Sequence, residues 1–191
     1  MTPKAAAIAL AAALAAATPA AAEPLFETFE RLCIAPAADA TISLAAADAE
    51  GWMPLPRSLM DSLNQGDDFT LQDGRMKSDR DGLFFMMHGG GTRRVGSDKL
   101  DIRMCAIGAM PGDAAQLRQA AAEWVGVEPN AQLSDGDDTA YVFEDTGAGH
   151  RALSDPDDAH AKRLLKAGRV QMIFLKADEE MVLVAFGVPT L

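Results

Sequence analysis

The sequence predicts an α+β domain, with a mostly antiparallel sheet of about five strands and helices packed largely on one face. Helical periodicity dominates the first third of the mature chain, and short turn-rich segments separate the later apolar runs, so neighbouring strands should pair antiparallel. The runs expected to form strands are 82–88, 99–109, 139–144, 169–176 and 181–188. A chain of 191 residues is long enough for one domain with a sizeable core.

Residues 1–22 have the organisation of a secretory signal peptide. Lys4 precedes a run of Ala, Leu and Ile, and small residues lead to a predicted cleavage site after Ala22. The apolar run is shorter than the roughly 20 residues that a spanning helix needs. An uncleaved anchor is the alternative, which the weak hydrophobicity of alanine disfavours. We therefore expect a periplasmic or secreted protein with a single domain at 23–191.

The chain is acidic, with 28 Asp and Glu against 17 Lys and Arg and a formal net charge of −11. Loss of Lys4 with the signal peptide makes the mature chain more acidic by one charge. Such a protein repels nucleic acid and anionic lipid surfaces. The partner is unknown; after export it would be a periplasmic or envelope protein, and no transmembrane segment is expected after the signal peptide. Solubility is the simplest interpretation of the charge.

Two cysteines, Cys33 and Cys105, are predicted to form a disulfide, because an even number of cysteines in an oxidising compartment usually pairs. Closing a loop of this length stabilises the fold by about 4 kcal/mol in the chain-entropy model. A reactive thiol is the alternative, but the two cysteines are too far apart in the sequence for a C-x-x-C motif.

The expected elements follow in order. Residues 24–33 form a short amphipathic helix, with proline in its first turn and Cys33 on its buried side. Asp39 caps a second helix that ends at Gly51, and further helical turns are expected at 59–63. A hairpin then joins 82–88 to 99–109, with Gly89, Gly90, Gly91 and Gly96 in its loop.

The second half alternates helices and strands. A helix runs from Asp113 to Gly126 and is followed by the strand at 139–144. Asp155 and Pro156 begin another helix, which carries Lys and Arg in its last turn and ends at Gly168. The final hairpin, 169–176 and 181–188, is apolar on both faces over much of its length, which is typical of central strands.

Two short motifs suggest hydrolases, and neither is complete. The run HGGG from His88 matches an oxyanion-hole motif of lipases, but the chain lacks the G-x-S-x-G serine that this motif serves. The run from Asp145 to Ala148 resembles the Asp-Thr-Gly-Ala loop of retropepsin-like aspartic proteases. Glu144, however, replaces the expected apolar residue, and only a short tail follows. We interpret the first motif as a hairpin loop and the second as a turn.

Metal and cofactor motifs are not found. His88, His150 and His160 lack ligand spacing, and no calcium-loop or cofactor motif occurs, so no cofactor is expected. A copper site at Met86, Met87 and His88 is disfavoured because strand alternation points Met87 away from the other two. His88, Arg93 and Arg94 are the candidate ligand-binding residues, since arginines beside glycines can hold an anion; solvated loop charges are the alternative.

The N-terminal pattern of Phe29, Cys33, Gly51 and Trp52 is similar to one that recurs in small exported proteins of uncharacterised function from Gram-negative bacteria. The resemblance covers under a fifth of the chain. It implies an exported single domain with a structural disulfide, and it implies no activity.

Three functional hypotheses follow. The favoured one is an exported, non-catalytic binding or accessory domain, because no catalytic set assembles from the sequence. The second is a periplasmic hydrolase in which His88, Arg93, Asp145 or His150 converge. The third is a metal-binding protein that uses histidines and methionines.

Overall fold

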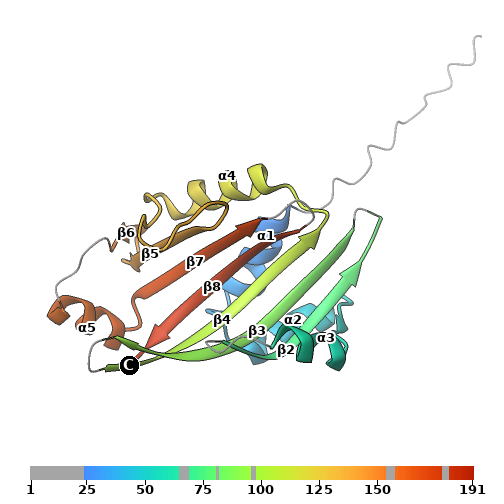
Figure 1. Cartoon of the computed structure of the whole chain (residues 1–191), viewed down its shortest axis with the longest axis horizontal. Helices are drawn as coiled ribbons and strands as arrows, with labels where there is room; N and C mark the ends of the chain where they lie inside the picture. The colour runs from blue at the N-terminus through green and yellow to red at the C-terminus, as the bar shows by residue number, and fades with distance from the viewer. Residues whose placement is uncertain (1–23, 65–68, 81, 96–97, 154–157, 178–180) are drawn as a thin grey trace, which may run out of the picture.

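The computed structural model describes residues 24–64, 69–80, 82–95, 98–153, 158–177 and 181–191. Within these ranges, eight strands form one antiparallel sheet in the order β1-β2-β3-β4-β8-β7-β5-β6, accompanied by five α-helices (Figure 1). The mixed helix-and-sheet character agrees with the sequence, but the expectation of about five strands is wrong. The predicted signal peptide, residues 1–22, lies outside the described residues.

The five expected strands form the contiguous centre of the sheet. They are β3 (Leu83–Val95), β4 (Asp98–Met110), β8 (Val182–Thr190), β7 (Val170–Ala177) and β5 (Thr139–Asp145). The strands that the sequence did not indicate are β1 (Met53–Pro54), β2 (Thr70–Ser78) and β6 (His150–Ala152). β1 and β6 form the two edges, and β2 pairs with β1. These outer strands are short or polar, so they lack the alternation of apolar residues that identifies a half-buried strand.

The run Gly89–Gly91 lies inside β3 rather than in the hairpin loop, which corrects the prediction. The reason is close approach of neighbouring backbones. A Cβ atom on Gly89 would overlap the carbonyl oxygen of Thr70 in β2, and one on Gly90 would lie 2.9 Å from the carbonyl oxygen of Ile102 in β4. Glycine inside a strand often marks such contacts. Gly96 lies outside the described residues.

We expect Gly89→Ala to lower the free energy of unfolding by about 1–3 kcal/mol, because the obstructing atom belongs to the backbone of β2. Urea unfolding measures the change. Gly187→Ala is the matched control, since the nearest atom to its new Cβ would be Met172 Cε, at 3.3 Å and at the end of a flexible side chain. Equal losses in the two variants would contradict the placement of Gly89 within β3.

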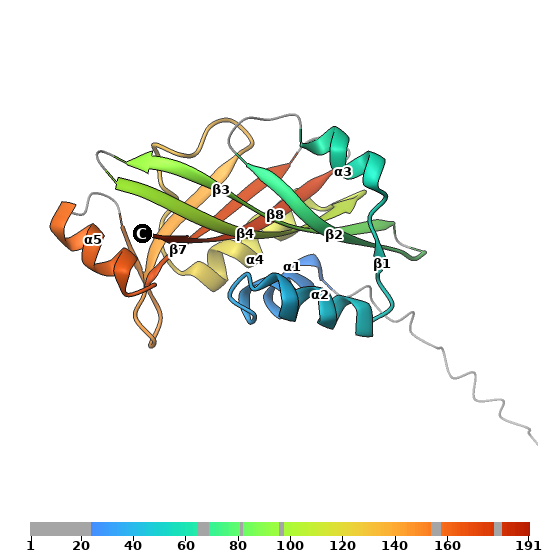
Figure 2. The ribbon, with the colours of Figure 1, turned by 90° about the horizontal axis from the view of Figure 1, so that it is seen from below.

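Three helical segments cover one face of the sheet (Figure 2). They are α1 (Leu25–Phe29) with the π-helical turn Glu30–Ile34 that continues it, α2 (Ala40–Ala49) and α4 (Ala114–Val125). The first segment matches the helix expected at 24–33. Its wide π-helical turn buries two consecutive residues, Leu32 and Cys33, both at 0% exposure.

The helix boundaries follow the predicted caps. The Asp39 carboxylate accepts a hydrogen bond from the Ile42 amide at 3.1 Å, and the Asp113 carboxylate accepts one from the Gln116 amide at 2.9 Å. Gly126 ends α4 with a φ of 65°, a left-handed conformation that glycine adopts without strain. These contacts confirm the starts of α2 and α4 and the end of α4.

The remaining helices lie elsewhere. α3 (Arg57–Leu63), expected from residues 59–63, contacts β2. α5 (Asp158–Lys166) forms most of the expected helix that ends at Gly168, whereas its predicted start at Asp155 and Pro156 lies outside the described residues. α5 and Glu144 line the same pocket, and strand alternation places Glu144 on the sheet face opposite to Phe143 and α4. The expectation of helices largely on one face therefore holds for α1, α2 and α4 only.

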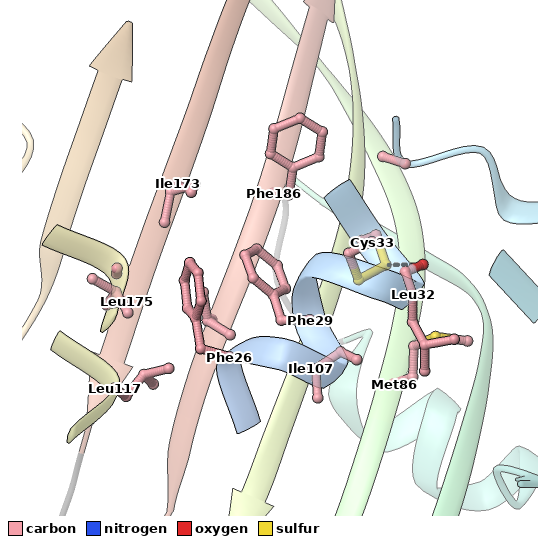
Figure 3. Close-up of a cluster of buried hydrophobic side chains, with 14 of the residues drawn as sticks. Phe26, Phe29, Leu32, Cys33, Met86, Ile107, Leu117, Ile173, Leu175 and Phe186 are labelled. Carbon is pink, nitrogen blue, oxygen red and sulfur yellow. Dashed lines mark hydrogen bonds between the residues drawn. A yellow bond between two sulfur atoms is a disulfide. The ribbon is translucent and has the colours of Figure 1, made fainter. Parts of the chain in front are cut away.

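The main core lies between the covering helices and the sheet (Figure 3). Most of its large, fully buried side chains come from the first helical segment and from the central strands. They include Phe29, Leu32, Met86, Ile107, Ile173 and Phe186, each at 0% exposure. Burial of side chains of this size supplies the main driving force for packing the helices on the sheet.

The opposite sheet face is also apolar, although its larger side chains are only half-buried. Phe85, Met87, Met104, Met172 and Phe174 lie there. Large side chains pack across small ones on neighbouring strands; a Cβ on the glycine at 108, for example, would overlap the ring of Phe85. Apolar residues on both faces identify β4, β8 and β7 as central strands, as expected for the final hairpin.

Beyond the residues of β2 that pair with β1, an asparagine side chain forms hydrogen bonds with both backbone groups of Leu71. Asn64 donates from Nδ2 to the Leu71 carbonyl oxygen at 3.0 Å and accepts at Oδ1 from the Leu71 amide at 2.6 Å. At the other side of the sheet, the Leu153 amide donates to the Val142 carbonyl oxygen at 3.0 Å.

Candidate functional site

Cys33 and Cys105 form a disulfide that joins the π-helical turn to β4 (Figure 3). Their Cα atoms are 5.3 Å apart, within the range for disulfides, although the residues are 72 positions apart in the chain. Both cysteines are at 0% exposure. The predicted pairing is confirmed, and it lies in the middle of the core.

His88 is enclosed in the protein. It lies on β3 between Asp73 of β2 and Cys105 of β4, and its side chain is 1% exposed. Its Nε2 atom is buried without a hydrogen-bond partner. Burial lowers the pKa of His88 to about 4, although the nearby carboxylates of Asp73 and Asp39 act in the opposite direction. His88 is therefore neutral at neutral pH.

The other two candidate ligand-binding residues are further along β3. Arg93 pairs with Leu100 and Arg94 with Lys99 in β4. At about 3.4 Å per residue, their backbones lie roughly 17–20 Å from that of His88. The backbone positions thus do not bring the three residues together, and their role in ligand binding stays a prediction.

The residues of the hydrolase hypothesis are also dispersed. His88 is on β3 and His150 is on the edge strand β6, five inter-strand spacings away, which is about 24 Å. Asp145 lies opposite His150 in the β5–β6 pair. It is on β5, four inter-strand spacings from β3, which is about 19 Å. The structure brings together Asp145 and His150 but joins neither to His88 or Arg93.

His150 is packed as a structural residue. Its ring lies 4.5 Å from the rings of both Trp124 and Phe143, measured between centroids. Its Nδ1 atom lies 3.0 Å from the Val125 carbonyl oxygen, with which it can form a hydrogen bond. The imidazole therefore fastens the C-terminal end of α4 to the β5–β6 hairpin.

The Asp-Thr-Gly run is the turn between β5 and β6, as interpreted from the sequence. Asp145 Oδ1 accepts a hydrogen bond from the Gly147 amide at 2.8 Å. Thr146 Oγ1 donates to the Gly149 carbonyl oxygen at 2.8 Å. Side-chain contacts of this kind stabilise turns.

For metals, the described part of the chain contains no group of three or more His, Cys, Asp or Glu that could hold an ion. Met86 shares the helix-covered face with His88 and is fully buried, whereas Met87 lies on the opposite face. The alternation that argued against a copper site at these residues is confirmed.

An ion-pair network connects α2 to β2. Arg75 contacts Asp48 of α2 through Nε at 2.6 Å and Asp73 of β2 through Nη1 at 2.7 Å. A hydrogen bond from Arg75 lowers the pKa of Asp48, and the same bond raises the pKa of Arg75. Since every member already has a partner, this network serves to hold α2 on the sheet.

A different charged cluster lines a pocket of about 550 Å³ between α5 and the β5–β6 hairpin. At its base is Glu144 on β5, with only 2% of the residue exposed. Glu144 Oε1 lies 2.5 Å from Arg169 Nη2, and Oε2 lies 3.4 Å from Arg151 Nη1. Arg163 of α5 completes the basic lining, and its Nη2 atom lies 3.3 Å from His160 Nδ1.

The sequence reasoning missed this cluster. A signal was present, because Glu144 occupies a position in the strand 139–145 where alternation predicts an apolar residue. A buried carboxylate requires a cationic partner, and Arg151 is its partner across the β5–β6 pair. Arg169, which follows α5, could be assigned to Glu144 only once the fold was known.

A second pocket, of about 190 Å³, lies where Pro24 and Phe26 of the first helical segment approach Leu117 of α4 and Val182 of β8. It is mostly apolar and smaller than the usual range for small-molecule sites, roughly 300–1,000 Å³. We do not assign it a ligand.

No protein-family model matches the chain, and neither curated proteins nor solved structures give a match to it. None of the helices in the described ranges combines the length and the apolar character needed to cross a bilayer.

Proposed function

We propose that this chain is an exported, non-catalytic binding or accessory domain that works in the periplasm or after secretion. The observation that carries the proposal is the disulfide between Cys33 and Cys105, which is fully buried in the core. Such bonds form and persist in oxidising compartments and are rare in the cytosol. The predicted signal peptide supports the same location.

The dispersal of the polar groups that a hydrolase would use supports the non-catalytic part of the proposal. His88 and His150 are about 24 Å apart by strand spacing. Ser43 is fully buried, and its Oγ atom makes no hydrogen bond, just as His88 Nε2 makes none. A serine nucleophile needs a base within hydrogen-bond reach. No specific observation in the described ranges favours the hydrolase or the metal-binding hypothesis.

Mass spectrometry of the protein recovered from the periplasm tests the proposal. The denatured mass is expected to correspond to a chain that begins at residue 23 and lacks two hydrogens, those of the thiols of Cys33 and Cys105. The native mass then reports a bound small molecule, or a protein partner if the complex survives. A protein that keeps its leader and both thiols would contradict export.

Turnover provides the second criterion. Catalysis of any reaction by the purified protein, with the activity lost when one polar residue is changed, would contradict the non-catalytic assignment. His88→Ala and His150→Ala are the two variants to compare, because each removes one histidine of the hydrolase hypothesis.

A further inference from the structure

Three guanidinium groups from three separate segments line the pocket between α5 and the β5–β6 hairpin. Arg151 comes from the edge strand β6, Arg163 from the last turn of α5, and Arg169 from the residues that connect α5 to β7. The fold therefore brings together cations from three different structural elements. Mutual repulsion makes such an arrangement unfavourable unless negative charge accompanies it.

The lining residues do not supply that negative charge in full. Glu144 is the one carboxylate among the described lining residues, so the three arginines leave an excess of two positive charges. This excess stands out in a chain with a formal net charge of −11. The carboxylate of Asp145, which is the next residue along, accepts hydrogen bonds from the Gly147 amide and the Gln171 side chain and does not line the pocket.

Glu144 holds two of the guanidinium groups in position. Arg169 uses Nη2 for Glu144 and Nε for the Asp145 carbonyl oxygen, at 2.5 Å and 3.1 Å. A guanidinium group has five N–H donors, so these contacts leave others available. The side chains of Arg151 and Arg169 remain 67% and 45% exposed, so a ligand can reach them from solvent.

We propose that this pocket binds a phosphate group carried by a small molecule, with Arg151, Arg163 and Arg169 as the binding residues. Glu144 is the positioning residue for Arg151 and Arg169. The second pKa of a phosphate monoester is about 6, so the group carries a charge of about −1.5 to −2 at neutral pH. This charge matches the excess of two positive charges in the pocket better than the single negative charge of a carboxylate does. Guanidinium groups recognise phosphate through paired N–H donors. This assignment rests on the proposed binding function and gives it a ligand class.

The phosphate could belong to a soluble ester or to a lipid headgroup, and the acidic surface of the protein favours the soluble form. Inorganic phosphate and glycerol 3-phosphate serve as soluble probes, and vesicles of phosphatidylglycerol in phosphatidylcholine serve as the membrane probe. The oxidised mature protein is titrated at low ionic strength, and the arginine Nε–H signals are followed by NMR. Saturable shifts with the soluble probes are the expected result; binding to vesicles alone would overturn the assignment to a soluble phosphate ester.

Arg151→Gln and Arg163→Gln are each expected to weaken phosphate binding about tenfold, since each removes a charge-assisted contact from an exposed position. Arg118→Gln is the matched control, because Arg118 lies on α4 with a side chain that is 40% exposed and pairs with Asp137 outside the pocket. An unchanged urea midpoint shows that each variant is folded. Affinity lost in both pocket variants but kept in the control supports the proposal.

Two results would overturn it. Absence of saturable phosphate binding would show that acidic side chains of the protein itself, or water, already bind the N–H donors of the arginines. Equal weakening in Arg118→Gln would show that the attraction is unspecific. Neither result would contradict the proposed export and binding function. That function is tested separately by the mass of the periplasmic protein, which does not depend on this pocket.

Discussion

Reduction of the Cys33–Cys105 disulfide is expected to lower the free energy of unfolding by about 4 kcal/mol. The bond connects residues 72 positions apart, so it removes much of the freedom of the unfolded chain. It also fastens the π-helical turn to β4 at the centre of the core. For a domain of this size the loss corresponds to a decrease in Tm of roughly 8–16 °C.

Urea unfolding of the oxidised and reduced protein measures this difference. The double variant Cys33→Ala with Cys105→Ala is the control, because it removes the bond without leaving thiols that can pair again. It should unfold at a urea concentration close to that of the reduced protein. A difference below about 1 kcal/mol between oxidised and reduced protein would mean that the bond constrains the unfolded chain far less than its loop length implies.

A second large effect is expected on acidification. The pKa of His88 is about 4 in the folded protein and 6.5 in the reference state, so between these values the unfolded chain binds more protons than the folded chain. Stability therefore falls as the pH decreases from 6.5 towards 4, by up to about 3 kcal/mol from this residue alone. The physical cause is burial of His88, which opposes a charge in the core.

The variant His88→Met isolates this contribution. Carboxyl groups titrate in part of the same pH range, so the informative quantity is the difference between the curves of stability against pH for the natural protein and the variant. That difference should change steeply between pH 6.5 and pH 4 and level off at higher pH. Parallel curves would show that His88 does not titrate differently in the folded and unfolded chains.

The central strands were predictable because burial on one or both faces leaves a strong apolar pattern. β4 and β8 show this pattern along most of their length. β2 was missed because its residues on the helix-covered face are charged, including Asp73 and Arg75. These two pair with each other, and Arg75 also pairs with Asp48 of α2. β1 has only two residues and β6 only three, so neither is long enough to show an alternating pattern in the sequence.

Features of loops and sites could be predicted where the interacting residues are close together in the sequence. Asp39 and Asp113 were identified as caps because a cap involves residues only three positions apart. Gly89–Gly91 were misassigned to a loop because the reason for glycine at 89 and 90 lies in neighbouring strands: the backbone of β2 approaches Gly89 and the backbone of β4 approaches Gly90. The pocket at Glu144 was missed for a similar reason, since Arg169 reaches it only through the fold.

The contact between Asn64 and Leu71 affects how copies of this protein behave towards one another. An outer strand with unused N–H and C=O groups can serve as a template for a strand from another molecule. The amide side chain of Asn64 occupies both groups of Leu71, and Leu153 occupies the Val142 carbonyl oxygen on the other side of the sheet. The sheet is open and has two edges, where strands of another molecule could pair. At these positions a side chain or a short flanking segment already occupies the backbone groups, which blocks edge-to-edge aggregation.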